Sequence, residues 1–366
     1  MKRLLFCLAA LVSTANAQII PNVNIYATYT DNLFLSSSQR SDLINATYVD
    51  LDYLVNEDLS FYYTGSTSVF SENADLFAHL HTFGSSYSRP FGNDDLFYAG
   101  AEIGLRLDRA LYDYRDFAEG RAFVSLKTYL RPNLLGRMGY KLRYQGFLNA
   151  INYSYVEQRF NTQFTHYLPS RTTLQLGGEL GLKTHVQTIK AESIFDLPAR
   201  SDQNRNLLQW VSRAKVAQSL GPNAGLQIEW VHRRNLTGQS RFTDLSFYNT
   251  DDDLFNDRYS YGGQQLGSTL KYLGPWNSQV EGSLQRESRS YNSRPTYALD
   301  GFPTGAFAEE TRRTVRLGLG RTFYSANSWA REIGIELEWL YRDIDSNDAF
   351  YDADARSYTI GIQLGF

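Results

Sequence analysis

The sequence predicts an all-β fold, a transmembrane antiparallel up-and-down β-barrel of about sixteen strands. Apolar and polar residues alternate in many short segments, as in the final stretch YTIGIQLGF, residues 358–366. Period two is typical of a strand whose two faces meet different surroundings. The chain contains 26 Tyr and 22 Phe, yet it has no run of the roughly 20 apolar residues that a membrane-spanning helix needs. Short turns also alternate with longer polar connections along the chain.

The first seventeen residues have the pattern of a secretory signal peptide. Lys2 and Arg3 form a basic start, and residues 4–12 form an apolar stretch that is too short to span a bilayer. Residues 15–17, Ala-Asn-Ala, match a cleavage site. The single cysteine, Cys7, lies within the apolar stretch, so the mature chain would have no disulfide.

The composition of the remaining chain favours a barrel over a helical membrane protein. Removing residues 1–17 leaves 366 − 17 = 349 residues and, with two positive charges lost, a net charge of −3 − 2 = −5. A mean hydropathy of −0.40 is too polar for a bundle of membrane helices. A barrel spreads its membrane signal over alternating strands of about 10 residues. We therefore divide the chain into a signal peptide, residues 1–17, and one outer-membrane β-barrel, residues 18–366.

The strands follow from the alternating segments and the turns between them. Short turns contain Pro or Gly, as at 129–132, 167–169, 219–222 and 272–275. Longer connections fall near 108–118, 186–203, 234–258, 288–308 and 343–354. This alternation is typical of barrels with short periplasmic turns and long outer loops. We count sixteen strands, and the weak alternation near 40–89 also fits a count of fourteen or eighteen. The expected spans are 22–35, 40–55, 58–71, 75–89, 95–107, 119–131, 135–147, 152–168, 171–185, 204–220, 224–234, 259–273, 277–288, 309–323, 330–342 and 356–366.

The terminal strand resembles the carboxy-terminal signal that the barrel-assembly machinery reads in bacterial outer-membrane proteins. Its apolar positions are Tyr358, Ile360, Ile362, Leu364 and Phe366. The resemblance implies that these residues form an assembly signal, and that their side chains meet lipid in the closed barrel. A closed barrel satisfies every backbone hydrogen bond within the membrane.

A second resemblance lies near the start of the mature chain. Residues 28–36, TYTDNLFLS, followed by residues 41–44, SDLI, resemble the opening of porin-type barrels of Gram-negative bacteria. Some of those barrels accompany exopolysaccharide export. The resemblance implies a channel in the outer membrane of a Gram-negative bacterium, with export of a polysaccharide as the alternative function.

Charged residues on the strand face opposite the apolar face are expected to line the lumen. One side of the ring carries mainly cations, and the other carries mainly carboxylates. We name the expected basic wall by its residues, which are Arg121, Lys127, Arg137, Lys141, Arg143 and Arg159. The expected acidic wall consists of Glu281, Glu332, Glu336 and Glu338.

The two walls predict a porin-like channel for passive diffusion of small hydrophilic solutes. In a ring of sixteen strands, the seventh and fifteenth strands stand opposite one another, so the walls would set up a transverse electric field. A barrel of this strand number usually leaves an aqueous channel. Three alternatives remain: paired charges that fill a plugged interior, a structural or adhesion barrel, and a barrel enzyme.

No residue pattern indicates catalysis or a cofactor. His79 and His81 could share one strand face and bind a metal, but the spacing gives no third ligand, and a histidine pair at an interface or in a loop is the simpler reading. Residues 251–253 with Asp257 lack the ligand pattern of a calcium loop, which favours a solvated acidic loop. We expect no enzyme activity, no metal, no cofactor and no nucleic-acid partner. The expected partners are outer-membrane lipids, lipopolysaccharide, the assembly machinery and a hydrophilic solute or a polysaccharide; the sequence does not define an oligomeric state.

Overall fold

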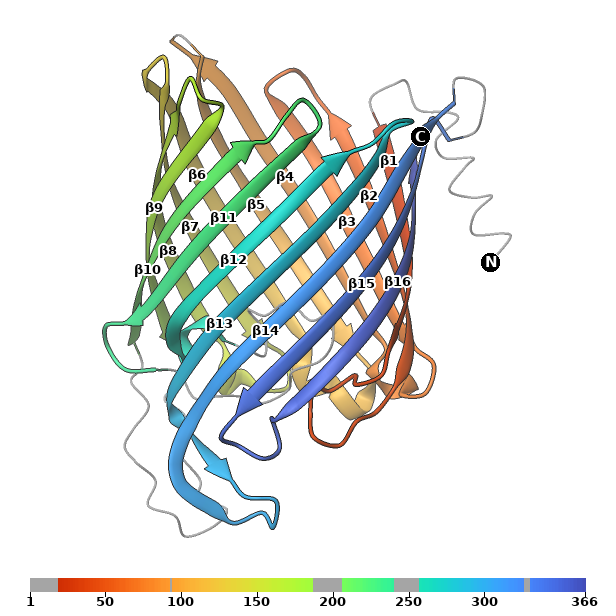
Figure 1. Cartoon of the computed structure of the whole chain (residues 1–366), viewed down its shortest axis with the longest axis vertical. Coiled ribbons are helices and arrows are strands. Elements are labelled where there is room, and N and C mark those ends of the chain that lie inside the picture. Colours follow the sequence, from red (N-terminus) through yellow and green to blue (C-terminus); the bar gives the residue numbers. More distant parts are fainter. Residues whose placement is uncertain (1–18, 93, 187–205, 240–256, 326–329) are drawn as a thin grey trace.

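The computed structural model describes residues 19–92, 94–186, 206–239, 257–325 and 330–366, and its sixteen strands form one closed barrel (Figure 1). Each strand is antiparallel to its neighbours in sequence, and the last strand pairs with the first. The predicted fold class and strand number are therefore confirmed. No helix within these ranges is long and apolar enough to cross a membrane. The strands are β1 (Ile19–Thr30), β2 (Asp42–Leu54), β3 (Leu59–Phe70), β4 (Ala78–Phe91), β5 (Asp95–Asp108), β6 (Phe117–Arg131), β7 (Leu134–Phe147), β8 (Tyr155–Tyr167), β9 (Thr172–His185), β10 (Asn206–Ser219), β11 (Ala224–Asn235), β12 (Gly262–Leu273), β13 (Ser278–Tyr297), β14 (Pro303–Tyr324), β15 (Glu332–Ser346) and β16 (Ala353–Gly365).

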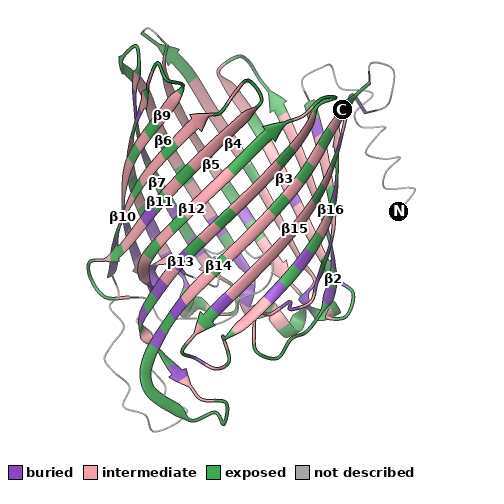
Figure 2. Cartoon of the chain, viewed as in Figure 1, coloured by how far each residue is buried: buried purple, intermediate pink, exposed green. Residues whose placement is uncertain are grey.

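The outer face of the barrel is apolar because alternate residues of each strand leave opposite faces. On β7, Met138, Tyr140, Leu142 and Tyr144 are exposed, and comparable exposed apolar residues lie on the other strands. An exposed ring of large apolar side chains is stable only in contact with lipid or a partner. Figure 2 shows exposed and half-buried residues covering the strands, with buried residues gathered toward one end. We call this exposed apolar ring the lipid belt.

The two ends of the barrel differ. Short turns connect the strands at the end where the carboxy terminus lies, and the long connections gather at the opposite end (Figure 1). The β12–β13 turn is tight, with Trp276 and Asn277 both at positive φ, 57° and 58°. Four 3-10 helices lie in long connections: η1 (Ala74–Leu76), η2 (Ala110–Arg115), η3 (Ile151–Tyr153) and η4 (Arg258–Ser260). In outer-membrane barrels the short turns are periplasmic and the long loops extracellular.

Inward-folded loops fill part of the extracellular half of the lumen. Leu33 and Leu76 from two loops pack on Ile44 and Phe70, which point inward from β2 and β3. The Asp42 carboxylate fixes the end of this cluster, because it accepts backbone hydrogen bonds from residues 71, 72 and 73 at 2.9–3.1 Å. The lumen is therefore narrower on the extracellular side than the bare strand ring would be.

Three strand limits differ from those expected by at least five residues. β1 ends at Thr30 instead of residue 35, because the following residues turn inward to form the cluster around Leu33. β13 and β14 run on as a long hairpin that projects beyond the other strands, where a loop over 288–308 was expected (Figure 1). Pro295 lies at a register irregularity in this hairpin, a position that tolerates proline. The expected signal peptide, residues 1–17, lies outside the described residues.

Candidate functional site

The strand register puts every residue of the two expected walls on the face opposite the lipid belt. In β7, Arg137, Lys141 and Arg143 alternate with the exposed Met138, Tyr140 and Leu142. Cross-strand partners share a face, and the register pairs the wall residues with one another or with other residues of that face. These residues therefore lie on the inner face of the barrel wall.

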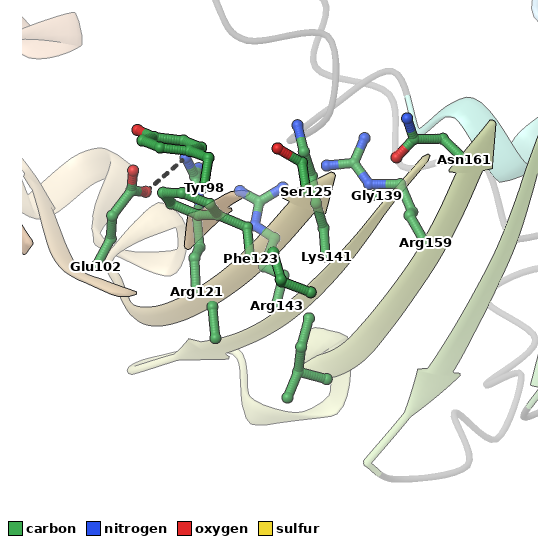
Figure 3. Close-up of a pocket in the computed structure, with 13 residues that line it drawn as sticks. Tyr98, Glu102, Arg121, Phe123, Ser125, Gly139, Lys141, Arg143, Arg159 and Asn161 are labelled. Atoms are coloured by element: carbon green, nitrogen blue, oxygen red, sulfur yellow. Dashed lines mark ion pairs between the residues drawn. The ribbon is translucent and has the colours of Figure 1, made fainter. Parts of the chain in front are cut away.

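Four residues of the basic wall line one cavity of about 480 Å³, shown in Figure 3. Arg121 on β6 pairs directly with Arg143 on β7, so two guanidinium groups lie side by side. The Glu119 carboxylate lies 3.0 Å from each of them, and Glu102 lies 3.6 Å from Arg121. Arg143 is only 4% exposed, so it holds the wall together instead of meeting solvent.

Lys141 is the cation of this cavity that is open to solvent. It pairs in register with Arg159, whose guanidinium lies 3.6 Å from Glu157. Lys141 is exposed and has no ion pair with any residue that the structure describes. Tyr98 and Phe123 stack at 5.3 Å on the same cavity wall. The cavity thus offers one free ammonium group, three paired guanidinium groups and an aromatic surface.

The remaining two residues of the basic wall lie outside this cavity, toward the short turns. Lys127 on β6 pairs directly with Arg137 on β7. The Lys127 ammonium lies 5.2 Å from the centre of the Tyr129 ring, and Arg137 is exposed. The basic wall consequently runs along the lumen from the periplasmic end to the cavity of Figure 3, instead of forming one compact cluster.

The acidic wall is built around a cation that the sequence analysis did not assign to it. Arg316 on β14 lies 2.5 Å from Glu338, 3.7 Å from Glu281 and 3.9 Å from Glu336. One guanidinium thus faces three carboxylates, which leaves an excess of negative charge. A cavity of about 430 Å³ opens here, with Asp50 on its other side. Glu332 is exposed at the short-turn end of β15 and lies outside this cavity.

The basic and acidic cavities lie on opposite sides of the ring. The basic cavity is lined by β5 to β8, and the acidic cavity by β14, β15, β16, β1 and β2. Lys141 on β7 and Glu336 on β15 are separated by 15 − 7 = 8 strands in one direction of the closed order and by 16 − 8 = 8 in the other. The rings of Tyr26 and Tyr48 meet edge to face, with their centres 5.9 Å apart, in the acidic cavity. Both cavities therefore combine charges of one predominant sign with aromatic rings.

A short segment that we name the inner hook, residues 257–261, folds against the lumen wall on the extracellular side of the basic cavity. Asp257 lies 2.6 Å from Lys183 on β9, and Arg258 lies 2.5 Å from Glu179 on the same strand. The hydroxyl of Tyr259 donates a 2.9 Å hydrogen bond to Glu157 on β8. Burial, with the adjacent Glu157 carboxylate, raises the pKa of Tyr259, so its phenol stays protonated and keeps donating.

Sequence reasoning missed four parts of this lumen. Glu119 and Arg316 both alternate with apolar residues on their strands, so inward parity could have identified them. Arg213 on β10 also points inward, is exposed, and extends the cationic side past β8. The inner hook could not be found from the sequence, because its position depends on contacts between residues up to 102 positions apart.

The histidines and acidic residues considered as metal ligands form no metal site in the described ranges. His79 and His81 share the lipid-side face of β4, where their ring nitrogens lie 3.0 Å apart and Tyr63 bonds to His81 at 2.8 Å. Asp257 is paired with Lys183, as described above. Residues 251–253 lie outside the described residues.

Comparison with known proteins identifies the fold. No protein-family model and no curated protein matches the chain. Among solved structures, it is similar to OccAB1 of Acinetobacter baumannii, with a TM-score of 0.52, 9% identity and coverage of 95% of this chain and 96% of that one. The outer membrane protein opdK of Pseudomonas aeruginosa has a TM-score of 0.52 and 10% identity, and the match covers 95% of this chain and 99% of that one. OprD of Pseudomonas aeruginosa has a TM-score of 0.50 and 9% identity, and the match covers 96% of this chain and 97% of that one.

The location of the chain follows from the fold together with its surface. A closed sixteen-strand barrel of this type, with a lipid belt of exposed apolar side chains, is built to sit in a bilayer. The chain is therefore a barrel of the outer membrane of a Gram-negative bacterium.

Proposed function

We propose that the protein is a porin-like channel for passive diffusion of small hydrophilic solutes. The observation that carries this proposal is the pair of cavities on opposite sides of one lumen, one with excess cations and one with excess carboxylates. A purely structural interior would pair its charges, whereas Lys141 and Arg213 have no ion pair among the described residues. Inward charges that stay open to water are typical of a wet lumen.

The two walls give the channel a transverse field. Water between low-dielectric walls concentrates the field of fixed charges, so a solute with separated charges would turn as it passes. The anionic part would lie toward Lys141 and Arg159, and the cationic part toward Glu336 and Glu338. Dipolar solutes would consequently pass with a preferred orientation.

We infer a weak preference for anions. Lys141 and Arg213 contribute unpaired positive charge to the lumen, and Lys127 with Arg137 extends it toward the periplasm. The excess carboxylates of the acidic cavity oppose this effect, because Arg316 neutralises only one of them. Selectivity would therefore be set by the balance of the two walls and would be modest.

Recording of single-channel currents in a planar bilayer tests the proposal. The purified, folded barrel should produce discrete steps of current, with a reversal potential in a salt gradient that indicates mild anion preference. Absence of conductance from protein that is folded and inserted would overturn the proposal and favour a plugged, structural barrel. The alternative of polysaccharide export receives no support from the proteins of similar structure.

We also propose that Tyr358, Ile360, Ile362, Leu364 and Phe366 act as the assembly signal. Tyr358, Ile360 and Ile362 are exposed on the outer face of β16, the strand that closes the barrel against β1. An apolar edge strand ending the chain would be accessible to the assembly machinery until closure. The arrangement supports this role because the pairing of β16 with β1 is the step that closes the barrel.

A further inference from the structure

Positive charges on the lipid-facing side of the barrel are concentrated on one flank. Strand parity puts Arg234, Arg286, Arg313 and Arg356 outward near the extracellular ends of β11, β13, β14 and β16. All four are exposed. The corresponding ends of β5 to β9 carry no outward charge within the described residues. This asymmetry lies on the outer face, apart from the two walls of the lumen, and requires a separate explanation.

Two of these arginines are direct cross-strand partners. Arg286 on β13 faces Arg313 on β14, and like charges directly opposite one another destabilise a sheet. Arg313 is partly neutralised by Asp343, at 2.7 Å, and by Asp345, at 3.9 Å. Arg286 has no hydrogen bond or ion pair with any residue that the structure describes. Arg313 is therefore already paired, whereas no described residue neutralises the positive charge of Arg286.

The lumen shows how the same arrangement is resolved where the protein supplies the anion. Arg121 and Arg143 are also direct partners, and the Glu119 carboxylate bridges them at 3.0 Å on each side. On the outer face no carboxylate of the described chain bridges Arg286 and Arg313. An anion that bridges Arg286 and Arg313 would therefore come from the surroundings of the barrel.

The position of the pair identifies those surroundings as the outer leaflet. Arg286 is flanked by Leu266 across the strand and by Leu284 two residues below, which are 56% and 58% exposed and belong to the lipid belt. Trp210, the register partner of Arg234, is exposed at the same end. Aromatic residues and arginines at the edge of a lipid belt lie at the level of the headgroups. The anion at that level belongs to a lipid.

We propose that Arg286 and Arg313 form a binding site for a phosphate group of an outer-leaflet glycolipid, with Arg234 as a neighbouring contact. Two guanidinium groups on adjacent strands present several N–H donors to one phosphate, and arginine matches phosphate geometry in a bidentate manner. The acyl chains of the same lipid would pack on Leu266, Leu284 and Leu317 below. Arginine near the membrane interface is tolerated at little cost, so the barrel folds without the lipid and binds it afterwards.

Native mass spectrometry of the purified full barrel, titrated with diphosphoryl lipid A in a neutral detergent, tests the site. The wild-type barrel should retain the lipid, and the variant Arg286→Gln/Arg313→Gln should bind it roughly tenfold more weakly, since two charge-assisted bonds are lost. Dephosphorylated lipid A should bind the wild-type barrel only as weakly as intact lipid A binds the double variant. Inorganic phosphate in solution should compete weakly, because it lacks the acyl chains.

The matched control is Arg89→Gln, an outward arginine at the opposite end of the barrel, which should retain the lipid as wild type does. Altered migration on heating verifies that each variant is folded. If the double variant fails this check, Arg286→Gln alone replaces it, because Arg286 has no partner to lose among the described residues. Equal retention by wild type and variant, or equal binding of the dephosphorylated lipid, would overturn the proposal. The site depends on membrane location and not on conduction, so these variants should conduct as wild type does.

Discussion

Tyr259 and Glu157 are joined by a 2.9 Å hydrogen bond although they lie 102 positions apart in the chain. The bond anchors the inner hook to β8, and Glu157 is also the carboxylate nearest Arg159 in the basic cavity. The position of the hook and the charge of the cavity are therefore linked through one side chain. This link makes the hook testable by electrical recording.

Replacing Tyr259 with Phe should loosen the hook. The change leaves a buried carboxylate with one donor fewer, which costs about 1–3 kcal/mol. We expect more frequent switching between current levels and unchanged ion preference, because no charge is altered. Tyr140→Phe, which removes a hydroxyl that bonds to Gln158 on the lipid side, is the control and should behave as wild type does. A Tyr259→Phe channel as steady as wild type would mean that the hook does not border the conducting path.

Reversing the charge of Lys141 should move the reversal potential in a salt gradient toward cation preference. One unit charge at 4 Å is worth about 1 kcal/mol in water, which is enough for a several-fold change in local ion concentration. Lys141→Glu is preferable to a change at Arg143, because Arg143 is buried against Glu119 and its loss would disturb the wall. Arg89→Glu, outside the lumen, is the matched control. A reversal potential that moves equally in both variants would show that Lys141 does not line the path.

The acidic cavity predicts two changes of opposite sign. Glu336→Gln/Glu338→Gln should increase anion preference, because Arg316 then has only Glu281 as a carboxylate partner. Arg316→Gln should decrease anion preference, because three carboxylates lose their shared cation. Both effects are read from reversal potentials of folded channels. If the two variants shift the potential in the same direction, the cavity acts through structure and not through its charge.

Replacing Phe366 with Asp should lower the amount of barrel in the outer membrane several-fold. A charge at the last apolar position of the terminal strand would impair its recognition as an assembly signal. Immunoblots of membrane fractions, with heated and unheated samples, measure both level and folding. Gln363→Ala, on the inner face of the same strand, should leave the level unchanged. Equal levels of the Asp variant and wild type would count against the assembly role.

Much of this barrel could be predicted because one face of each strand meets lipid and the other meets the lumen, which gives the sequence a period-two pattern. The alternation of Lys141 with Leu142 defined both a strand and the face toward lipid, and sixteen such strands were counted correctly. The charge balance of the walls was less predictable, since it depends on which residues meet across strands. Glu119 forms ion pairs with two arginines, Arg121 and Arg143, only because β6 and β7 pair in this register.

Features that depend on long-range contacts were beyond sequence reasoning. A long connection was expected near 288–308, whereas pairing between β13 and β14 continues past Pro295 with a register irregularity. The inward turn after Thr30 likewise depends on Ile44 and Phe70, which form a surface for Leu33. Local propensity contains no information about such partners.

The pairing of β1 with β16 has a consequence for the order of events during biogenesis. Thr28 and Thr359 bond through their hydroxyl groups at 2.9 Å across a separation of 331 residues, so the seam closes a loop that comprises nearly the whole strand region. Until β16 has been made, the growing sheet has two free edges whose unpaired amides and carbonyls invite association with other chains. A polypeptide that ends before β16 would keep both free edges, because it cannot close the barrel. Quality control need only detect a persistent open edge to distinguish a truncated product from a finished barrel.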